Sequence, residues 1–193
     1  MAGHPIYLAL IGLGAYLIGA IPFSYIVPRV FARKDIREYG SGNPGASNVA
    51  RECGKTYGAA SLLLDAGKGV VAVFLVAQLQ APLAIGISAV LGHVTSPFLN
   101  FSGGKGVATY LGCIFYISWP AGLIFAGVWT GALLIWNYAG LSSLLAVLTV
   151  PVTFFFCQLS VTLVWASVGS VALIYFTHRG NIRRIVEGEE NVM

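Results

Sequence analysis

The chain has 193 residues, of which 57% are hydrophobic and 9% charged, with a formal net charge of +4. Its mean hydropathy is +0.81. Soluble globular domains carry about 25% charged residues, so this composition excludes that class and indicates an integral membrane protein. We expect one membrane domain over residues 1–193, because no stretch is polar enough to form a second one, and we expect no nucleic-acid partner.

Apolar segments of membrane-spanning length alternate with short basic segments, as in a polytopic helical bundle. We expect the first three spans at residues 6–30, 59–79 and 83–99. Residues 106–178 contain no Asp, Glu, Lys or Arg, and four short spans fit there. The breaks between these four are expected near Trp119–Pro120, at residues 137–143, and near Gln158–Leu159.

The basic residues predict the orientation, because Lys and Arg gather on the cytoplasmic side. They lie between residues 29 and 55, at Lys105, and at residues 179–184, with Lys68 as the exception inside a span. The predicted fold is an all-α bundle of about seven transmembrane helices, with the N-terminus outside and the C-terminus cytoplasmic. A three-span reading of residues 106–178, with Pro120 kinking one long helix, is the alternative, but it places the last basic segment outside.

The segment GSGNPGASNVARECGKT, which begins at Gly40, contains two sequences that resemble nucleotide-binding motifs: a dinucleotide fingerprint and the end of a P-loop. A dinucleotide fingerprint follows a strand, whereas a predicted transmembrane helix and the charged segment RKDIREY come first here. A P-loop requires glycine six residues before its lysine, and that position is Val49. Neither motif is therefore present.

Residues 40–51, which we name the first loop, still have the properties of an anion site. Glycines allow close approach of backbone N–H groups to a phosphate, and a following helix N-terminus and a cation complete such a site. The alternative is a polar turn between spans. The candidate residues of this loop are Ser41, Gly42, Asn43, Gly45, Asn48 and Arg51.

Residues 101–109, FSGGKGVAT, form a second loop of the same character on the same predicted side of the membrane. Gly103, Gly104 and Gly106 surround Lys105, and a new helix is expected from Val107. These features favour a phosphate cradle. A lysine that only sets the topology is the alternative.

Three ionisable residues are expected within spans, where an unpaired charge costs several kcal/mol. Asp65 and Lys68 are three residues apart on one helix and can pair while facing the bundle interior. A structural ion pair and a substrate contact by Lys68 both stay open. His93 is either a satisfied structural group or a catalytic one.

The tail adds His178 and Asn181, which would share one face if the last helix continues through Gly180. Both are candidates for orienting a substrate or moving a proton. Ser143, in the polar hairpin at residues 137–143, has a weaker claim. The three cysteines show neither a C-x-x-C pair nor an even count, so we expect no metal and no cofactor.

Four motifs in order resemble the bacterial acyl-phosphate:glycerol-3-phosphate acyltransferases, integral membrane enzymes of phospholipid synthesis. The resemblance covers nearly the whole chain. Ser47 stands where the family more often has Thr, and Asn137 where a basic residue is expected. The motifs are GSGNPGASNVAR at 40–51, LLDAGKG at 63–69, GHVTSPFLNFSGGKGVAT at 92–109 and HRGNIRRIVEGEE at 178–190.

The resemblance implies transfer of a fatty acyl group from acyl phosphate to the 1-hydroxyl of sn-glycerol 3-phosphate, giving lysophosphatidic acid and phosphate. The enzyme would lie in the bacterial inner membrane, among membrane lipids, with its active site facing the cytoplasm; its oligomeric state stays open. The catalytic residues implied are Ser41, Arg51, Lys105, His178 and Asn181. The substrate-binding residues implied are Gly42, Asn43, Gly45, Asn48, Lys68, His93, Gly103, Gly104, Gly106 and Ser143.

By the same resemblance, the second loop would hold glycerol 3-phosphate and the first loop the donor, although the sequence does not fix which loop holds which phosphate. The sequence also leaves open whether His178 or the donor phosphate accepts the proton. A membrane transporter of a phosphorylated metabolite is the alternative function. Transporters commonly bind substrate near the midplane between repeats, whereas the candidates here gather at one end of the spans.

Overall fold

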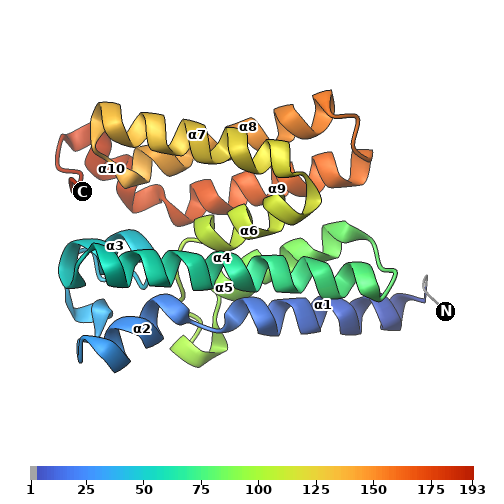
Figure 1. Ribbon diagram of the computed structural model, residues 1–193, viewed down its shortest axis with the longest axis horizontal. Coiled ribbons are helices and arrows are strands. Elements are labelled where there is room, and N and C mark those ends of the chain that lie inside the picture. Colours follow the sequence, from blue (N-terminus) through green and yellow to red (C-terminus); the bar gives the residue numbers. More distant parts are fainter. Residues whose placement is uncertain (1–3) are drawn as a thin grey trace. The chain divides into compact units, whose positions relative to one another are not determined.

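The computed structural model describes residues 4–193, which form helices joined by short loops and contain no strand (Figure 1). This confirms the all-α prediction for the described part of the chain. The chain divides into two compact units, Met1–Ile117 and Ser118–Met193.

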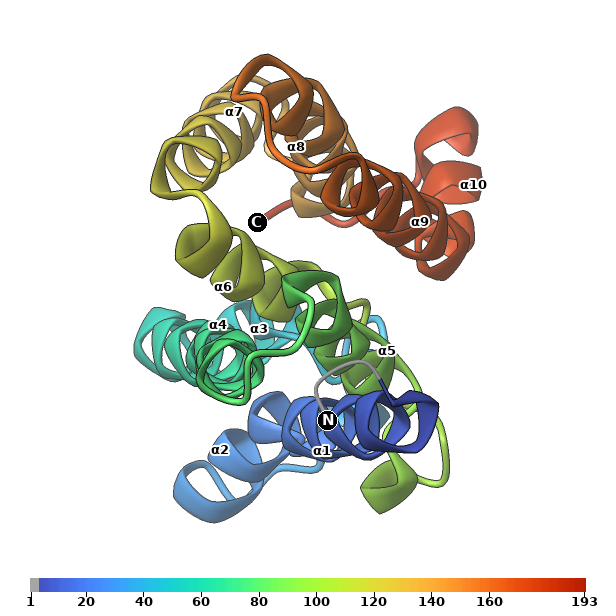
Figure 2. The same cartoon turned by 90° about the vertical axis from the view of Figure 1, so that its right-hand side faces the viewer.

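The first unit is organised around its longest helix, α4, which packs on α1, α2, α3 and α6. Figure 1 shows α1 and α2 end to end alongside α4, and Figure 2 shows α4, α5 and α6 end-on. The helices are α1 (Pro5–Ala20), α2 (Phe23–Phe31), α3 (Ala46–Cys53), α4 (Lys55–Gln78), α5 (Ser88–Val94) and α6 (Val107–Ile117). Short 3-10 turns are η1 (Ile36–Glu38), η2 (Leu83–Ile87) and η3 (Pro97–Leu99).

The predicted first span is one apolar segment, Pro5–Phe31, but it is broken into α1 and α2. Pro22 lacks an N–H group and disfavours a helical conformation in the residue before it, and Ile21 accordingly has φ −59° and ψ 118°. The break leaves backbone carbonyl groups without helical partners inside an apolar segment. Other parts of the first unit must satisfy them.

Glycines let the helices of the first unit approach closely, as small residues do in membrane bundles. A Cβ atom at Gly69 of α4 would clash with the carbonyl of Thr109 in α6, and one at Gly112 would clash with that of Ala66. Along α1, Gly19 packs in the same way on the backbone of α5.

The predicted third span, residues 83–99, is one apolar segment but not one regular helix. This segment forms η2, then the seven-residue helix α5, then η3. Gly86 lies in η2 and is packed against Val73, while Pro97 begins the final turn.

The second unit consists of α7 (Trp119–Trp136), α8 (Ala139–Phe156), α9 (Val161–Thr177) and α10 (Arg179–Glu187). Helix α8 packs on both α7 and α9 (Figure 1). The three breaks predicted for residues 106–178 are confirmed. Pro120 lies in the first turn of α7, where its missing N–H is not needed, so it begins a helix and does not kink a longer one.

Several helices are long and apolar enough to cross a membrane. Four such segments are Pro5–Phe31, α4, α7 and α8, while α9 and α10 form a bent pair with 56° between them. Two shorter apolar segments are Leu83–Leu99 and α6. The protein is therefore a membrane helical bundle.

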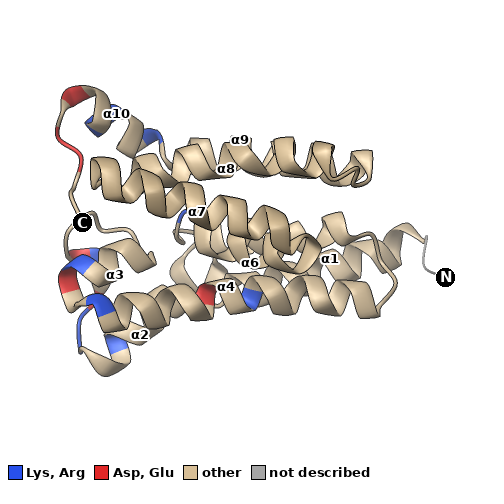
Figure 3. Ribbon diagram, turned by 45° about the horizontal axis from the view of Figure 1, so that its top comes forward, with Lys and Arg blue, Asp and Glu red and all other residues tan. Residues whose placement is uncertain are grey.

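Charged residues avoid most of the helical surface in both units (Figure 3). In the first unit they gather on α2, α3 and the loops beside them, and in the second unit on α10 and the tail. The exceptions are Lys105, just before α6, and Asp65 and Lys68, midway along α4. Charges at such a depth need partners.

Candidate active site

The shape of the first loop is held by Asn48, whose side chain is 2% exposed. Its Oδ1 atom accepts a hydrogen bond from the backbone N–H of Ser41 at 3.1 Å and one from Arg51 Nη2 at 3.4 Å. Its Nδ2 atom donates to the carbonyls of Ile36 at 3.3 Å and Tyr39 at 3.0 Å. Asn48 thus brings Ser41 and Arg51 together, and its amide is occupied by the protein.

The glycines of the first loop are required by its backbone and by the crowding inside it. Gly40 and Gly42 have φ values of +56° and +68°, in the region that favours glycine. A Cβ at Gly40 would lie 2.5 Å from Oδ1 of Asn48, and one at Gly45 would lie 2.6 Å from Nδ2 of Asn43. The loop therefore closes tightly just before the N-terminus of α3.

The segment leading into the first loop is fixed by neighbouring charges. Arg37 donates from Nε and Nη2 to Asp35 at 2.9 and 2.7 Å, and this hydrogen bonding lowers the pKa of Asp35 to about 2. The side chain of Lys34 donates to the carbonyl of Glu52 at 2.9 Å. These cations hold the loop in place.

The second loop packs directly on the end of α5. The N–H groups of Gly103 and Gly104 donate to the carbonyls of Val94 at 3.0 Å and His93 at 3.1 Å. These two N–H groups therefore have acceptors within the protein, while substrate binding by Gly103 and Gly104 stays a prediction. The two glycines also act by close approach, because a Cβ on either would clash with His93.

The two loops meet within the first unit. A Cβ at Gly104 would lie 2.8 Å from the carbonyl oxygen of Pro44, which belongs to the first loop. Gly106 has φ +89° and turns the chain into the first turn of α6. Residues predicted from two distant motifs are therefore brought together at the N-termini of α3 and α6.

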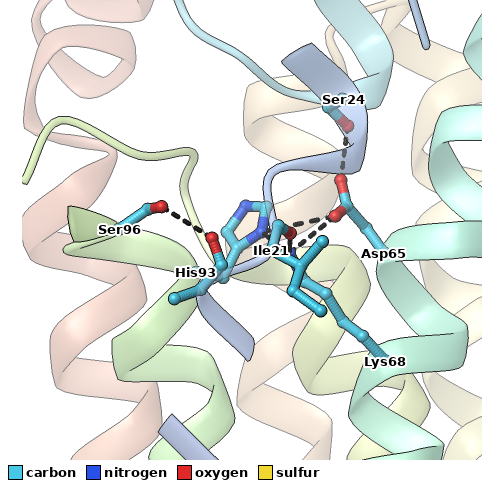
Figure 4. A network of polar contacts seen from close by, with 7 residues as sticks. Ile21, Ser24, Asp65, Lys68, His93 and Ser96 are labelled. Carbon is cyan, nitrogen blue, oxygen red and sulfur yellow. Dashed lines mark hydrogen bonds and ion pairs between the residues drawn. The ribbon is translucent and has the colours of Figure 1, made fainter. Parts of the chain in front are cut away.

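Beneath the second loop lies a buried cluster of Ser24, Asp65, Lys68 and His93 (Figure 4). Nζ of Lys68 pairs with Oδ1 of Asp65 at 2.7 Å and donates to Nδ1 of His93 at 2.8 Å and to the carbonyl of Ile21 at 2.6 Å. Ser24 donates to the other oxygen of Asp65. The exposed fractions of the four residues lie between 1% and 6%.

This cluster confirms the predicted Asp65–Lys68 pair, while a substrate contact by Lys68 or His93 stays a prediction. An ammonium group has three donors, and those of Lys68 face three protein acceptors. Because an ammonium group only donates, Nδ1 of His93 accepts, so in the neutral ring the proton lies on Nε2, facing Gly104.

Ser24 and Ser96 were not predicted from the sequence. Pro22 could have indicated them, because a helix break in an apolar segment frees backbone carbonyls that need hydrogen-bond donors. Ser96 donates to the carbonyl of Ala20 at 2.6 Å, as Lys68 does to that of Ile21 (Figure 4). Both carbonyls are released by the break, so polar side chains nearby were required.

In the second unit, His178 is buried at the end of α9 and its Nδ1 atom lies 2.8 Å from the carbonyl oxygen of Ile174. A carbonyl oxygen only accepts, so Nδ1 carries the proton and the neutral ring has its lone pair on Nε2. Asn181, three residues later, is also buried.

Asn181 is held by a residue that sequence reasoning left out of the site. Its Nδ2 atom donates to Oε1 of Glu190 at 2.6 Å, and Arg184 donates to Oε2 at 3.0 Å. A Cβ at Gly140 would lie 2.7 Å from the amide of Asn181. Glu190 is the last residue of the fourth motif, and its place in that motif could have indicated a role in the site.

A comparison with known proteins decides the family. The model of the glycerol-3-phosphate acyltransferase family matches residues 9–188. The chain belongs to this family. Among the relatives of this acyltransferase, that of Dinoroseobacter shibae is 42% identical over 190 residues, covering 96% of this chain and 93% of the relative. That of Neisseria meningitidis serogroup B is 40% identical over 185 residues, covering 92% of each.

Two crystal structures of PlsY (YgiH), an integral membrane glycerol 3-phosphate acyltransferase, share the fold of this acyltransferase. The glycerol 3-phosphate form has a TM-score of 0.90 and 34% identity, covering 96% of this chain and 95% of that chain. The lysophosphatidic acid form has a TM-score of 0.87 and 32% identity, with the same coverage. The predicted family and enzyme class are confirmed.

In this acyltransferase, Ser143 is used to join two helices. Its hydroxyl donates to the carbonyl of Ala139 at 2.8 Å and accepts from the indole of Trp129 at 3.1 Å. These contacts hold α7 against α8. They give Ser143 a structural role, and its part in substrate binding stays a prediction.

Proposed function

We propose that the protein transfers a fatty acyl group from acyl phosphate to the 1-hydroxyl of sn-glycerol 3-phosphate, giving lysophosphatidic acid and inorganic phosphate. The observation that carries this proposal is the meeting of two glycine loops, one with Arg51 and one with Lys105, beside two helix N-termini. Two phosphorylated substrates need two such groups of donors. PlsY, a related protein, has been solved in glycerol 3-phosphate and lysophosphatidic acid forms, which fit the proposed acceptor and product.

We assign the acceptor phosphate to the second loop. Lys105 lies two residues before α6, whose first N–H groups have no partners within the helix and add positive potential. Gly106 allows the turn that places Lys105 there. Gly103 and Gly104 hold this backbone against α5.

We assign the donor to the first loop. Ser41, Asn43 and Arg51 would contact the phosphate of the acyl phosphate or the oxyanion that develops at its carbonyl. Asn48 would position Ser41 and Arg51 without contacting the substrate, because its amide is already hydrogen-bonded. The acyl chain would lie among apolar helices.

The reaction is a direct transfer with no acyl-enzyme, because an acyl phosphate is already activated. The 1-hydroxyl oxygen attacks the carbonyl carbon, a new ester C–O bond forms, and the bond to the phosphate oxygen breaks. Phosphate leaves with the electron pair. The protein supplies orientation and charge stabilisation.

The hydroxyl proton needs an acceptor, and Nε2 of His178 has the lone pair for this role, since Nδ1 is bonded to Ile174. The donor's own phosphate is the alternative acceptor. Asn181, fixed by Glu190, would orient the acceptor hydroxyl.

We further propose seven crossings of the bacterial inner membrane, with the N-terminus outside and the active site facing the cytoplasm. The support is the number of apolar segments, seven when the two shorter ones and the bent pair are included, and the position of the basic residues between them. The proposed acyltransferase domain covers residues 1–193.

The proposal is tested in sealed vesicles containing the purified protein, with acyl phosphate and radiolabelled glycerol 3-phosphate. Labelled lysophosphatidic acid should form. Uptake of label into the vesicles without acylation would instead identify a transporter.

A further inference from the structure

Within the buried cluster, His93 also contacts the second loop. Its Nδ1 atom accepts from Lys68 at 2.8 Å, and its carbonyl accepts from the N–H of Gly104 at 3.1 Å. Its Nε2 edge fills the space where a Cβ of Gly104 would be. His93 therefore joins the cluster to the loop through both its backbone and its ring.

The other side of the cluster is anchored on three separate elements. Lys68 and Asp65 come from α4, the carbonyl of Ile21 from the break between α1 and α2, and Ser24 from α2. The side chains of Asp65, Lys68 and Ser24 are buried, so their contacts are made in a medium of low dielectric constant where they are strong. The ring of His93 is consequently held in one orientation.

We propose that Asp65, Lys68 and His93 are positioning residues for the second loop: they fix the imidazole ring, the ring fixes Gly104, and Gly104 fixes the backbone that presents Lys105. This inference rests on the proposed function of that loop as the acceptor-phosphate site. The three residues touch no substrate themselves. Their effect is on the binding of glycerol 3-phosphate, because the loop that they support carries its phosphate.

Positioning of the loop and general structural support have different effects on the kinetics. Loss of general support would lower the fraction of active enzyme and leave both KM values unchanged. Loss of positioning would raise the KM for glycerol 3-phosphate and leave the KM for acyl phosphate unchanged.

The informative variant is His93→Asn, because an Asn side-chain oxygen can stand where Nδ1 does and still accept from Lys68. The ion pair stays intact, while the ring edge against Gly104 is lost. We expect the KM for glycerol 3-phosphate to rise about tenfold, which corresponds to loss of one well-placed contact. The matched control is Ser96→Ala, which removes a hydrogen bond to the same break but no contact with Gly104.

A double variant tests the contact itself. Gly104→Ala places a methyl group 2.2 Å from Nε2 of His93 and 2.8 Å from the carbonyl oxygen of Pro44, and His93→Asn relieves the first of these two close approaches. We expect the two substitutions together to raise the acceptor KM less than the product of their separate effects. Gly104→Ala also tests the contact from the loop side if His93→Asn does not fold.

Failure of the proposed function and failure of the positioning role would give different results. Wild-type protein that fails to acylate glycerol 3-phosphate would overturn the proposed function. Active wild type with an unchanged acceptor KM in folded His93→Asn, or with strictly multiplicative effects in the double variant, would overturn the positioning role.

Discussion

Two lysines illustrate how surroundings decide the role of a residue. Lys68 lies midway along α4 with three protein acceptors around its ammonium group, whereas Lys105 lies in a glycine-rich loop at the start of α6. The sequence predicts that both are unusual, and it predicts the pairing of Lys68 with Asp65 from their spacing. It cannot predict the contacts with Ile21 and His93, because these depend on how three helices pack.

Lys105→Ala should raise the KM for glycerol 3-phosphate and lower kcat/KM by roughly 100-fold or more, because a charge-assisted contact to phosphate is lost. Steady-state kinetics with varied acceptor measure this. The control is Lys55→Ala, an exposed lysine at the start of α4. Near-normal kinetics of a folded Lys105→Ala would remove this residue from the site.

His178→Asn separates the two proton acceptors. The Asn amide can still donate to the carbonyl of Ile174, as Nδ1 does now, but it offers no base at the position of Nε2. If His178 is the base, kcat should fall by about 100-fold or more, with little change in either KM. A kcat within a few-fold of wild type would assign the proton to the donor phosphate.

Among the elements, α4 determines how the first unit packs. Its glycines look alike in sequence, but they differ in their surroundings. Gly69 packs on the backbone of α6, whereas a Cβ added at Gly67 would have no neighbouring atom within 4 Å. Sequence patterns predicted the breaks around α7, α8 and α9, where Pro120 and Asn137 act locally. They did not predict the 3-10 turns at both ends of residues 83–99, where Gly86 packs closely on Val73 and Pro97 begins the last turn.

The two glycines of α4 make a matched pair for a stability test. Gly69→Ala should destabilise the protein by about 1–3 kcal/mol, because the methyl group forces α4 away from the carbonyl of Thr109. Gly67→Ala should be neutral or slightly stabilising, since alanine favours helix by up to about 1 kcal/mol over glycine. Thermal unfolding in detergent measures both. Equal Tm values would show that α4 and α6 do not pack as described.

For the whole molecule, the motifs predicted the family from the sequence alone, whereas the division into two compact units was not predicted. Composition indicates how many segments can enter a membrane, but contacts between distant segments, such as Gly104 with Pro44, are not encoded in any local pattern. The proposed topology also concerns the whole chain and can be tested with its natural cysteines.

Cys157 is exposed between α8 and α9, and Cys53 is partly exposed at the end of α3. Seven crossings place Cys157 outside and Cys53 in the cytoplasm. In right-side-out vesicles, a membrane-impermeant maleimide should label Cys157 alone, and permeabilisation should add Cys53. Labelling of Cys53 before permeabilisation, or protection of Cys157, would contradict this topology.

The central claim is direct transfer of the acyl group from acyl phosphate to glycerol 3-phosphate. Its covalent rival is an acyl group on Cys53, the cysteine just after the first loop and two residues from Arg51. The decisive measurement is the inorganic phosphate released when purified protein is mixed rapidly with acyl phosphate, first without acceptor and then with it, in the absence of added metal or thioester. The account predicts release only with glycerol 3-phosphate, in an amount equal to the lysophosphatidic acid formed. A burst of phosphate equal to the enzyme before acceptor is added, or no release after it, would contradict the account.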